Sequence, residues 1–171
     1  VVSGRGLDIS PFKELLEKYV DEEKIRSSPC DLYVTSLSVT DRREVVFDVK
    51  QAPPGTIKDV LLASAFFPAF KNEKLGGKTY LDGGMVNNVP VDVLAERGYK
   101  NLIVIRIYGI GVDTERRTEL PEDVNVYRIA PRRNLGGILE FEKKRTRRSM
   151  TLGYFDARRL LYGLAGRKYY F

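Results

Sequence analysis

The sequence predicts an α/β fold, as a partial three-layer α/β/α domain with a mostly parallel sheet and a C-terminal helical region. Residues 102–107 are almost continuously apolar, which is typical of a strand covered on both faces in a parallel sheet. A strand ending near residue 82 and a helix over about residues 89–97 come before this run. The order strand, helix, strand indicates a βαβ unit with a right-handed crossover, packed in layers.

Length and composition favour one domain and exclude several classes of site. A chain of 171 residues with 43% hydrophobic content can bury a sizeable core. It contains no histidine, which excludes Ser-His-Asp and Cys-His mechanisms and His-ligated zinc within this chain. General-base chemistry must therefore come from a carboxylate, a lysine or a tyrosine. Cys30 is the single cysteine, so we expect a small buried hydrophobe rather than a disulfide or a metal ligand.

The formal net charge of +6 would favour binding to an anionic surface such as phospholipid or nucleic acid, but a moderate excess of charge can also simply keep a protein soluble. Basic residues gather near the start of the C-terminal helical region, where two interpretations stay open: a solvated helix face or a contact with anionic lipid headgroups. The residues are Lys143, Lys144, Arg145, Arg147 and Arg148. The sequence has no recognisable nucleic-acid-binding motif, so we expect no nucleic-acid partner.

No apolar run approaches the ~20 residues that span a bilayer, and no secretory leader is visible. Because the first residue is Val1 rather than methionine, we expect the natural N-terminus to be absent. A cytoplasmic or peripheral membrane location follows as the expectation.

The first half of the chain predicts a helix, a hairpin and a second helix. Ser10 as N-cap and Pro11 begin a helix whose apolar residues should pack on a core; they are Phe12, Leu15, Leu16, Tyr19 and Val20. Two β-rich runs, 31–40 and 45–49, predict a hairpin. Thr56 and Asp59 form a capping-box variant that begins a helix ending near Ala65.

The second half predicts a helix ending at Gly98, a charged loop over residues 109–123, a strand over residues 124–129 and a long C-terminal helix. Apolar residues at helical spacing should lay one stripe of that last helix on the body of the protein. They are Met150, Tyr154, Ala157, Leu161 and Leu164.

Residues 78–90 contain the strongest candidate for chemistry. Asp82 follows a short apolar run, and Gly83 and Gly84 come directly after it. Residues without a Cβ allow a sharp turn that other backbone segments or a substrate can approach closely. Asn87 and Asn88 then offer a helix N-cap. An ordinary strand–turn–helix connection is the alternative, because Asp-Gly is a frequent turn dipeptide.

The order of these motifs resembles the C-terminal half of the patatin-like phospholipase family. The likeness rests on Ala63-Ser64-Ala65, Pro68 and Phe70, then Tyr80-Leu81-Asp82-Gly83-Gly84, then Asn88-Val89-Pro90, a helix, Gly98 and an apolar strand. Residues 9–21, 27–32, 135–141 and 153–154 also look like bacterial members. The resemblance implies an α/β/α acyl hydrolase that cleaves ester bonds of phospholipids with a Ser-Asp dyad, without cofactor or metal.

Carried over by motif, Asp82 matches the catalytic aspartate of the family, and Gly83 and Gly84 match the glycines that follow it. The family's serine, in a Gly-x-Ser-x-Gly elbow after a glycine-rich oxyanion loop, has no counterpart. Ser3 lacks the preceding glycine, and Ser64 has no glycine elbow, so close packing explains it better than chemistry.

We therefore expect residues 1–171 to be the C-terminal portion of a single patatin-like domain whose nucleophile-bearing N-terminal portion is absent. The intact protein would be a phospholipase-like acyl hydrolase, and this chain would supply the aspartate. The alternative is a non-catalytic module that binds lipid or protein.

Overall fold

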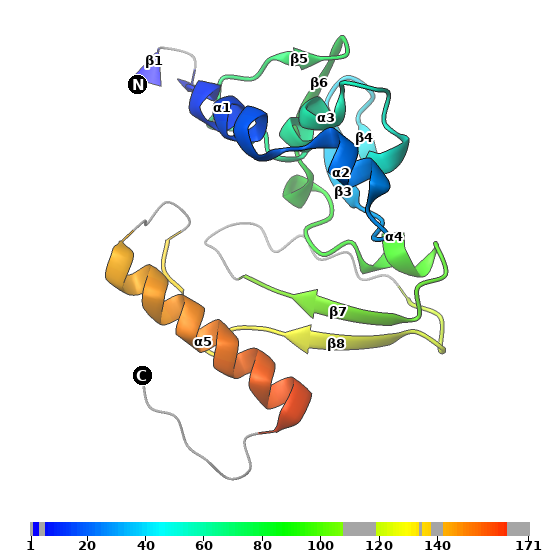
Figure 1. The fold of residues 1–171 in the computed structure, drawn as a ribbon, viewed down its shortest axis with the longest axis vertical. Helices are drawn as coiled ribbons and strands as arrows, with labels where there is room; N and C mark the ends of the chain where they lie inside the picture. The colour runs from blue at the N-terminus through cyan, green and yellow to red at the C-terminus, as the bar shows by residue number, and fades with distance from the viewer. Residues whose placement is uncertain (1, 4–5, 108–118, 134, 138–141, 164–171) are drawn as a thin grey trace. The chain divides into compact units, whose positions relative to one another are not determined.

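A computed structural model of the chain describes residues 2–3, 6–107, 119–133, 135–137 and 142–163. These residues divide into two compact units, one up to Pro90 and one from Val91 onwards. Figure 1 shows their helices and strands. Most of the charged loop expected over residues 109–123 lies outside the described residues, as do 138–141 and Leu164.

A four-stranded sheet in the order β4-β3-β6-β5 forms the centre of the first unit (Figure 1). Its strands are β3 Tyr33–Ser38, β4 Arg43–Asp48, β5 Lys74–Leu75 and β6 Lys78–Asp82. Strands β3 and β4 pair from Tyr33↔Asp48 to Ser38↔Arg43, which confirms the predicted hairpin. All three pairings in this sheet are antiparallel, as is the short pair β1 Val2–Ser3 and β2 Gly6–Leu7.

The helices of the first unit are α1 Ser10–Tyr19, α2 Glu22–Ser27, η1 Val49–Gln51, α3 Ile57–Ser64 and η2 Gly83–Met85. Helix α3 begins after Thr56, as predicted, but the capping box does not form. The Thr56 hydroxyl instead donates to the Pro53 carbonyl at 2.7 Å, so it closes the preceding turn.

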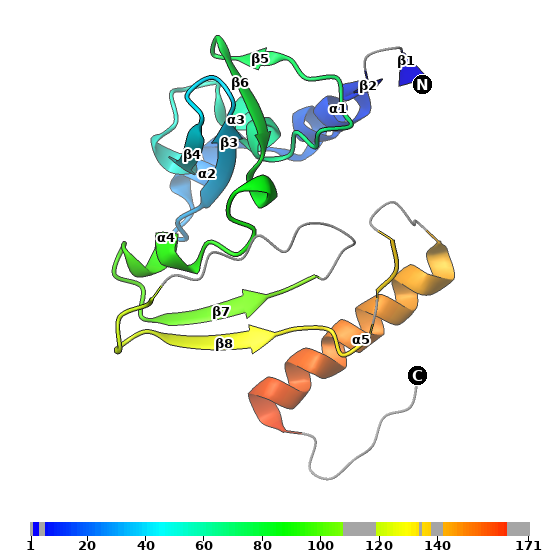
Figure 2. The same cartoon turned by 180° about the vertical axis from the view of Figure 1, so that it is seen from behind.

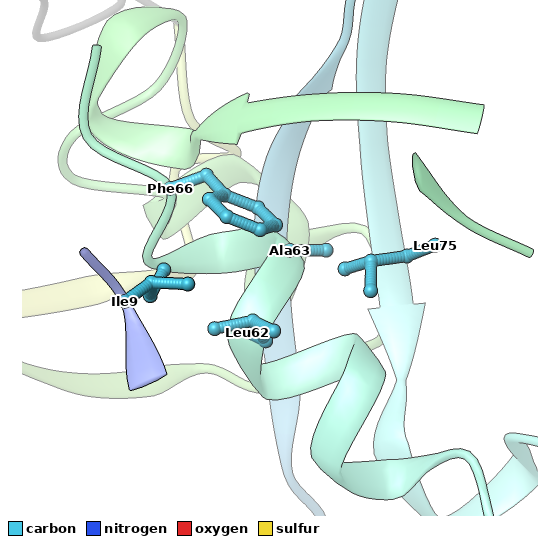
Figure 3. Packing of buried hydrophobic residues seen from close by; sticks show 5 residues of the cluster. All are labelled: Ile9, Leu62, Ala63, Phe66 and Leu75. Atoms are coloured by element: carbon cyan, nitrogen blue, oxygen red, sulfur yellow. The ribbon is translucent and has the colours of Figure 1, made fainter. Parts of the chain in front are cut away.

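Helix α3 supplies the core of the first unit. Leu62 and Ala63 pack with Ile9, Phe66 and Leu75 in one cluster, seen from close by in Figure 3. Ile57 and Val60 pack with Val49 and Ala52 in a second cluster. Because α3 contributes to both clusters, its position against the sheet is fixed from two sides.

The predicted packing of α1 is only partly correct. Leu16 contacts the first cluster and Val20 the second, but Phe12, Leu15 and Tyr19 are exposed. Helix α1 contains no buried residue, so it packs on the unit through partly buried side chains only. The expectation for Cys30 is also wrong: it is exposed, in a turn where its N–H donates to Ser28 Oγ.

The second unit contains α4 Val91–Ala95, β7 Asn101–Ile105, β8 Asn125–Ile129 and α5 Lys143–Tyr162. Strands β7 and β8 pair in parallel from Asn101↔Asn125 to Ile105↔Ile129, as the reverse view in Figure 2 shows. The α/β class is thus confirmed, and the parallel order holds for this pair. It does not hold for the four-stranded sheet.

The predicted βαβ unit is wrong, because β6 and β7 belong to different sheets. Strand β6 pairs with β3 through residues 80–82 and with β5 through residues 78–79. Both neighbours of β6 in its sheet are therefore antiparallel, and neither of them is β7.

Strand β7 is covered on one face only, contrary to the expectation from its apolar run. Leu102 and Val104 are buried, whereas Ile103 and Ile105 are 59% and 71% exposed. Helix α4 contacts β7 and helix α5 contacts β8. Ile103 and Ile105 thus lie on the uncovered face of β7 within the described part of the second unit.

The predicted stripe of α5 also faces the wrong way. Leu152 and Asp156 are the buried residues of this helix, while Met150, Tyr154 and Leu161 are exposed. The segment is helical, as its apolar spacing predicts, but its inward face carries one aliphatic side chain and one carboxylate instead.

Substituting Glu22 should reveal an acid-sensitive contact in the first unit. Both carboxylate oxygens of Glu22 lie within 3.1 Å of the Gly55 nitrogen, and Arg26 donates to Oε1 through Nε and Nη2. The Gly55 N–H, and then Arg26, hold the pKa of Glu22 below its ordinary value of 4.5. A lowered folded-state pKa contributes stability above pH 4.5 that is lost as the pH falls through the folded-state value.

We therefore expect Glu22→Gln to lower the melting temperature at neutral pH, by an amount that shrinks as the pH is lowered below 4.5. Thermal unfolding of both proteins across this pH range measures the effect. A difference that stays constant at all pH values would contradict it.

The exposed face of β7 should make the isolated chain self-associate, because a parallel sheet is normally covered on both faces and exposed apolar strands promote association. Ile103→Lys with Ile105→Lys should then shift sedimentation of the 171-residue chain toward the monomer. The control pair Leu15→Lys with Tyr19→Lys, also at exposed apolar residues, should not. A wild-type chain that stays monomeric at high concentration would overturn this expectation.

Candidate active site

Asp82 ends strand β6 and forms the N-cap of η2, as expected for a carboxylate on a sharp turn. Its Oδ1 accepts the Gly84 N–H at 2.7 Å, and its own N–H donates to the Phe66 carbonyl at 2.8 Å. Backbone and side chain are therefore both held. The residue is half-buried.

Gly83 is buried against strand β3 and tolerates no side chain. A Cβ at this position would lie 2.3 Å from the Thr35 carbonyl oxygen and 2.4 Å from Thr35 Oγ1. A Cβ on Gly84 would lie 3.1 Å from Asp82 Oδ1 and 3.2 Å from Asn88 Oδ1. The two glycines thus have different roles, since the first permits close backbone packing and the second leaves room around the carboxylate.

Two serine hydroxyls join α3 to the sheet beneath the Asp82 turn. Ser36 Oγ lies 2.8 Å from the Ala63 carbonyl oxygen and 2.9 Å from that of Leu81. Ser64 Oγ donates to the Thr35 carbonyl at 2.7 Å. Sequence reasoning missed Thr35 and Ser36, although small polar residues in the middle of an apolar strand are a signal of close approach.

Neither of these serines is hydrogen-bonded to Asp82. Ser36 is fully buried, and the Ser64 hydroxyl is directed at a backbone carbonyl. The packing role predicted for Ser64 therefore agrees with its contact. No hydrogen-bond donor among the residues that the structure describes reaches Asp82 Oδ2.

Two Ser–Asp hydrogen bonds occur elsewhere among the described residues, and both are structural. Ser38 Oγ donates to Asp41 Oδ2 at 2.9 Å, but Ser38 is fully buried in the β3–β4 hairpin. Ser10 Oγ donates to Asp8 at the start of α1. Hydrogen bonds from Lys78 and Ser38 lower the pKa of Asp41, and those from Ser10 lower the pKa of Asp8. Lowered pKa values make both poor general bases near neutral pH.

Asn87 does not cap a helix. It is buried, its backbone N–H donates to the Gly83 carbonyl at 2.9 Å, and its Nδ2 donates to Glu44 Oε1 at 3.1 Å. The side chain therefore ties the glycine turn to strand β4, and α4 begins only at Val91.

The structure brings Asp82, Gly83 and Gly84 together in one turn of the first unit. The predicted basic residues lie in the second unit, exposed on the first two turns of α5. They are Lys143, Lys144, Arg145, Arg147 and Arg148.

Gly83→Ala tests the close packing of the turn. Because the new Cβ would meet backbone atoms of Thr35, the substitution should destabilise the protein by about 1–3 kcal/mol, the usual cost of overpacking. Gly153→Ala is the control: no atom lies within 4 Å of the position that its Cβ would take, so the change should be neutral or stabilise by up to about 1 kcal/mol. Equal melting temperatures for Gly83→Ala and wild type would contradict the packing argument.

No helix in the described part of the chain is both long and apolar enough to cross a bilayer.

No curated protein sequence matches the chain. Comparison with known protein families matches residues 3–95 to the family described as patatin-like phospholipase. The matched range contains Asp82, Gly83 and Gly84 and covers more than half of the 171 residues. This match supports hydrolysis of lipid acyl esters in general. The chain belongs to the patatin-like phospholipase family.

Proposed function

We propose that the protein is a serine-dependent lipid acyl hydrolase in which Asp82 is the general base of a Ser-Asp dyad. The observation that carries the proposal is the Asp82 turn: one carboxylate oxygen is held by the Gly84 N–H, and the turn is packed against Thr35 through Gly83. A base held in this way keeps its second oxygen aimed in one direction, which is what positioned proton transfer requires.

The proposed reaction begins with attack of a serine Oγ on the ester carbonyl while Asp82 takes the serine proton. Backbone N–H groups stabilise the oxyanion that forms. The tetrahedral intermediate then expels the alcohol, which leaves with the proton and gives an acyl-enzyme. Asp82 next takes a proton from water, and the water oxygen attacks the acyl carbon to form a second tetrahedral intermediate. The bond from the acyl carbon to the serine Oγ then breaks, Asp82 returns the proton to Oγ, and the fatty acid leaves.

The nucleophile lies outside residues 1–171 in this proposal. The serines beside the Asp82 turn support it, because Ser36 is buried and Ser64 donates to Thr35. Residues 1–171 would then be the C-terminal portion of one domain, and the preceding portion would bring the serine elbow and the oxyanion loop.

Asp82→Asn tests the role of the carboxylate. The amide oxygen can still accept the Gly84 N–H, so the turn should persist, but the amide cannot take a proton from serine. We expect hydrolysis of phospholipid or p-nitrophenyl esters by the full-length protein to fall by about 10²–10⁴-fold with an unchanged melting temperature.

Asp48→Asn is a closely matched control. Asp48 also ends a strand, forms the N-cap of a 3₁₀ helix and accepts the N–H two residues later, that of Lys50. Its substitution should leave hydrolysis unchanged. Wild-type turnover by Asp82→Asn, or an equal loss in both variants, would overturn the assignment.

The isolated 171-residue chain tests where the nucleophile lies. It should hydrolyse p-nitrophenyl esters no faster than buffer, because no accessible serine is hydrogen-bonded to Asp82 in the described residues. Turnover that Ser64→Ala abolishes would place the nucleophile in α3 instead. A gene that encodes no Gly-x-Ser-x-Gly before these residues would favour a non-catalytic module that binds lipid or protein.

A further inference from the structure

Helix α5 carries a surface that the proposed reaction does not use. It is the longest helix described, with 20 residues, and its mode of attachment fixes which side faces solvent. Leu152 and Asp156 face inward, and Arg132 Nε donates to Asp156 Oδ1 at 2.7 Å. The Asp156 side chain is only 4% exposed. A buried carboxylate needs its cationic partner, so this pair holds the rotation of α5 about its axis.

The opposite side of α5 forms one continuous amphipathic stripe. Positions 143, 147, 150, 154 and 161 are separated by steps of four, three, four and seven, so they share a face. Lys143 and Arg147 occupy its N-terminal part. Met150, Tyr154 and Leu161 follow and are 71%, 57% and 51% exposed.

The first turn of α5 carries a surplus of positive charge, which the single N-cap carboxylate of Glu142 does not balance. Three basic residues begin the helix, and its first turn contains no acidic residue. Cations at a helix N-terminus oppose the helix dipole. Among the described residues, no carboxylate pairs with Lys143, Lys144, Arg147 or Arg148. An anionic partner would relieve this arrangement.

The basic residues are exposed at the start of α5. An open hollow of about 590 Å³ borders the helix, and the described residues that line it come from α5. They are Lys143, Lys144, Arg147, Arg148 and Thr151. Exposed basic side chains along one helix can lie flat on an extended anionic surface.

We propose that α5 docks the protein on an anionic phospholipid surface. Lys143, Lys144 and Arg147 contact the headgroups, and Met150, Tyr154 and Leu161 insert at the boundary with the acyl chains. We expect stable binding to need both the headgroup contacts and the apolar insertion, because charges at a membrane surface are screened by salt. The choice of lipid over another polyanion rests on the proposed function, since a lipid acyl hydrolase must reach its substrate in an aggregate.

Vesicle sedimentation with the full chain tests the proposal, using neutral phosphatidylcholine vesicles and vesicles that contain phosphatidylglycerol. Because no turnover is measured, the result is independent of the Asp82 mechanism. Binding should require phosphatidylglycerol and weaken with salt. Each basic residue near an anionic membrane strengthens partitioning about fivefold. Replacing three of them together, by Lys143→Gln, Lys144→Gln and Arg147→Gln, should therefore reduce the partition coefficient by about a hundredfold.

A matched control removes three exposed basic residues from the first unit: Arg42→Gln, Lys71→Gln and Lys74→Gln. It changes the net charge equally and should reduce binding far less. In the same way, Met150→Ser with Tyr154→Ser should weaken binding in high salt, whereas Leu15→Ser with Tyr19→Ser on α1 should not. Unchanged melting temperatures show that the variants fold.

Three outcomes would overturn the proposal. The first is no binding to phosphatidylglycerol vesicles, and the second is an equal loss in the two charge triples. The third is tighter binding to a polyanion such as RNA than to vesicles, with no effect of Met150→Ser and Tyr154→Ser, which would identify a general polyanion surface. The full-length variant with Lys143→Gln, Lys144→Gln and Arg147→Gln should still hydrolyse a soluble ester. This second measurement separates a failure of membrane docking from a failure of the proposed function.

Discussion

The contact between Gly83 and the backbone of Thr35 is the constraint on which the candidate site depends. Because Gly83 has no Cβ, the turn after β6 can lie directly against β3. Ser64 donates to the same Thr35 carbonyl, and Ser36 links α3 to Leu81 next to Asp82. Helix, strand and turn thus meet at one point of the backbone, and Asp82 takes its position from all three.

This arrangement explains why a carboxylate in an ordinary Asp-Gly turn is a credible base here. The same turn geometry recurs at Asp48, where Oδ1 also accepts the N–H two residues later. What differs at Asp82 is the support around it, since the Phe66 carbonyl fixes its backbone and Asn87 ties the turn to Glu44 on β4. Precise placement of a catalytic group depends on such supporting contacts more than on the residue itself.

Local patterns in the sequence were enough to predict the Asp82 turn, the β3–β4 hairpin, the approximate extents of α3 and β8, and a long C-terminal helix, because turn residues and periodicity act over a few residues. They were not enough for properties that depend on distant partners. The apolar run of β7 suggested two covered faces, yet Ile103 and Ile105 are exposed. The antiparallel pairing of β6 likewise depends on β3, which lies about forty residues earlier in the chain, and on β5, which directly precedes β6. Nor does periodicity distinguish an inward stripe from an outward one, and the Asp156–Arg132 pair decided that question for α5.

The central claim is that Asp82 is the base that serves the nucleophilic serine. The most direct measurement is a crystal structure of the full-length protein after reaction with a fluorophosphonate, which marks the reactive serine covalently. Our account predicts the label on a serine that precedes residue 1 of this chain, with an Asp82 carboxylate oxygen within hydrogen-bond reach of that serine's Oγ, at about 2.6–3.2 Å. A label on Ser64, or a different carboxylate at that distance, would contradict it.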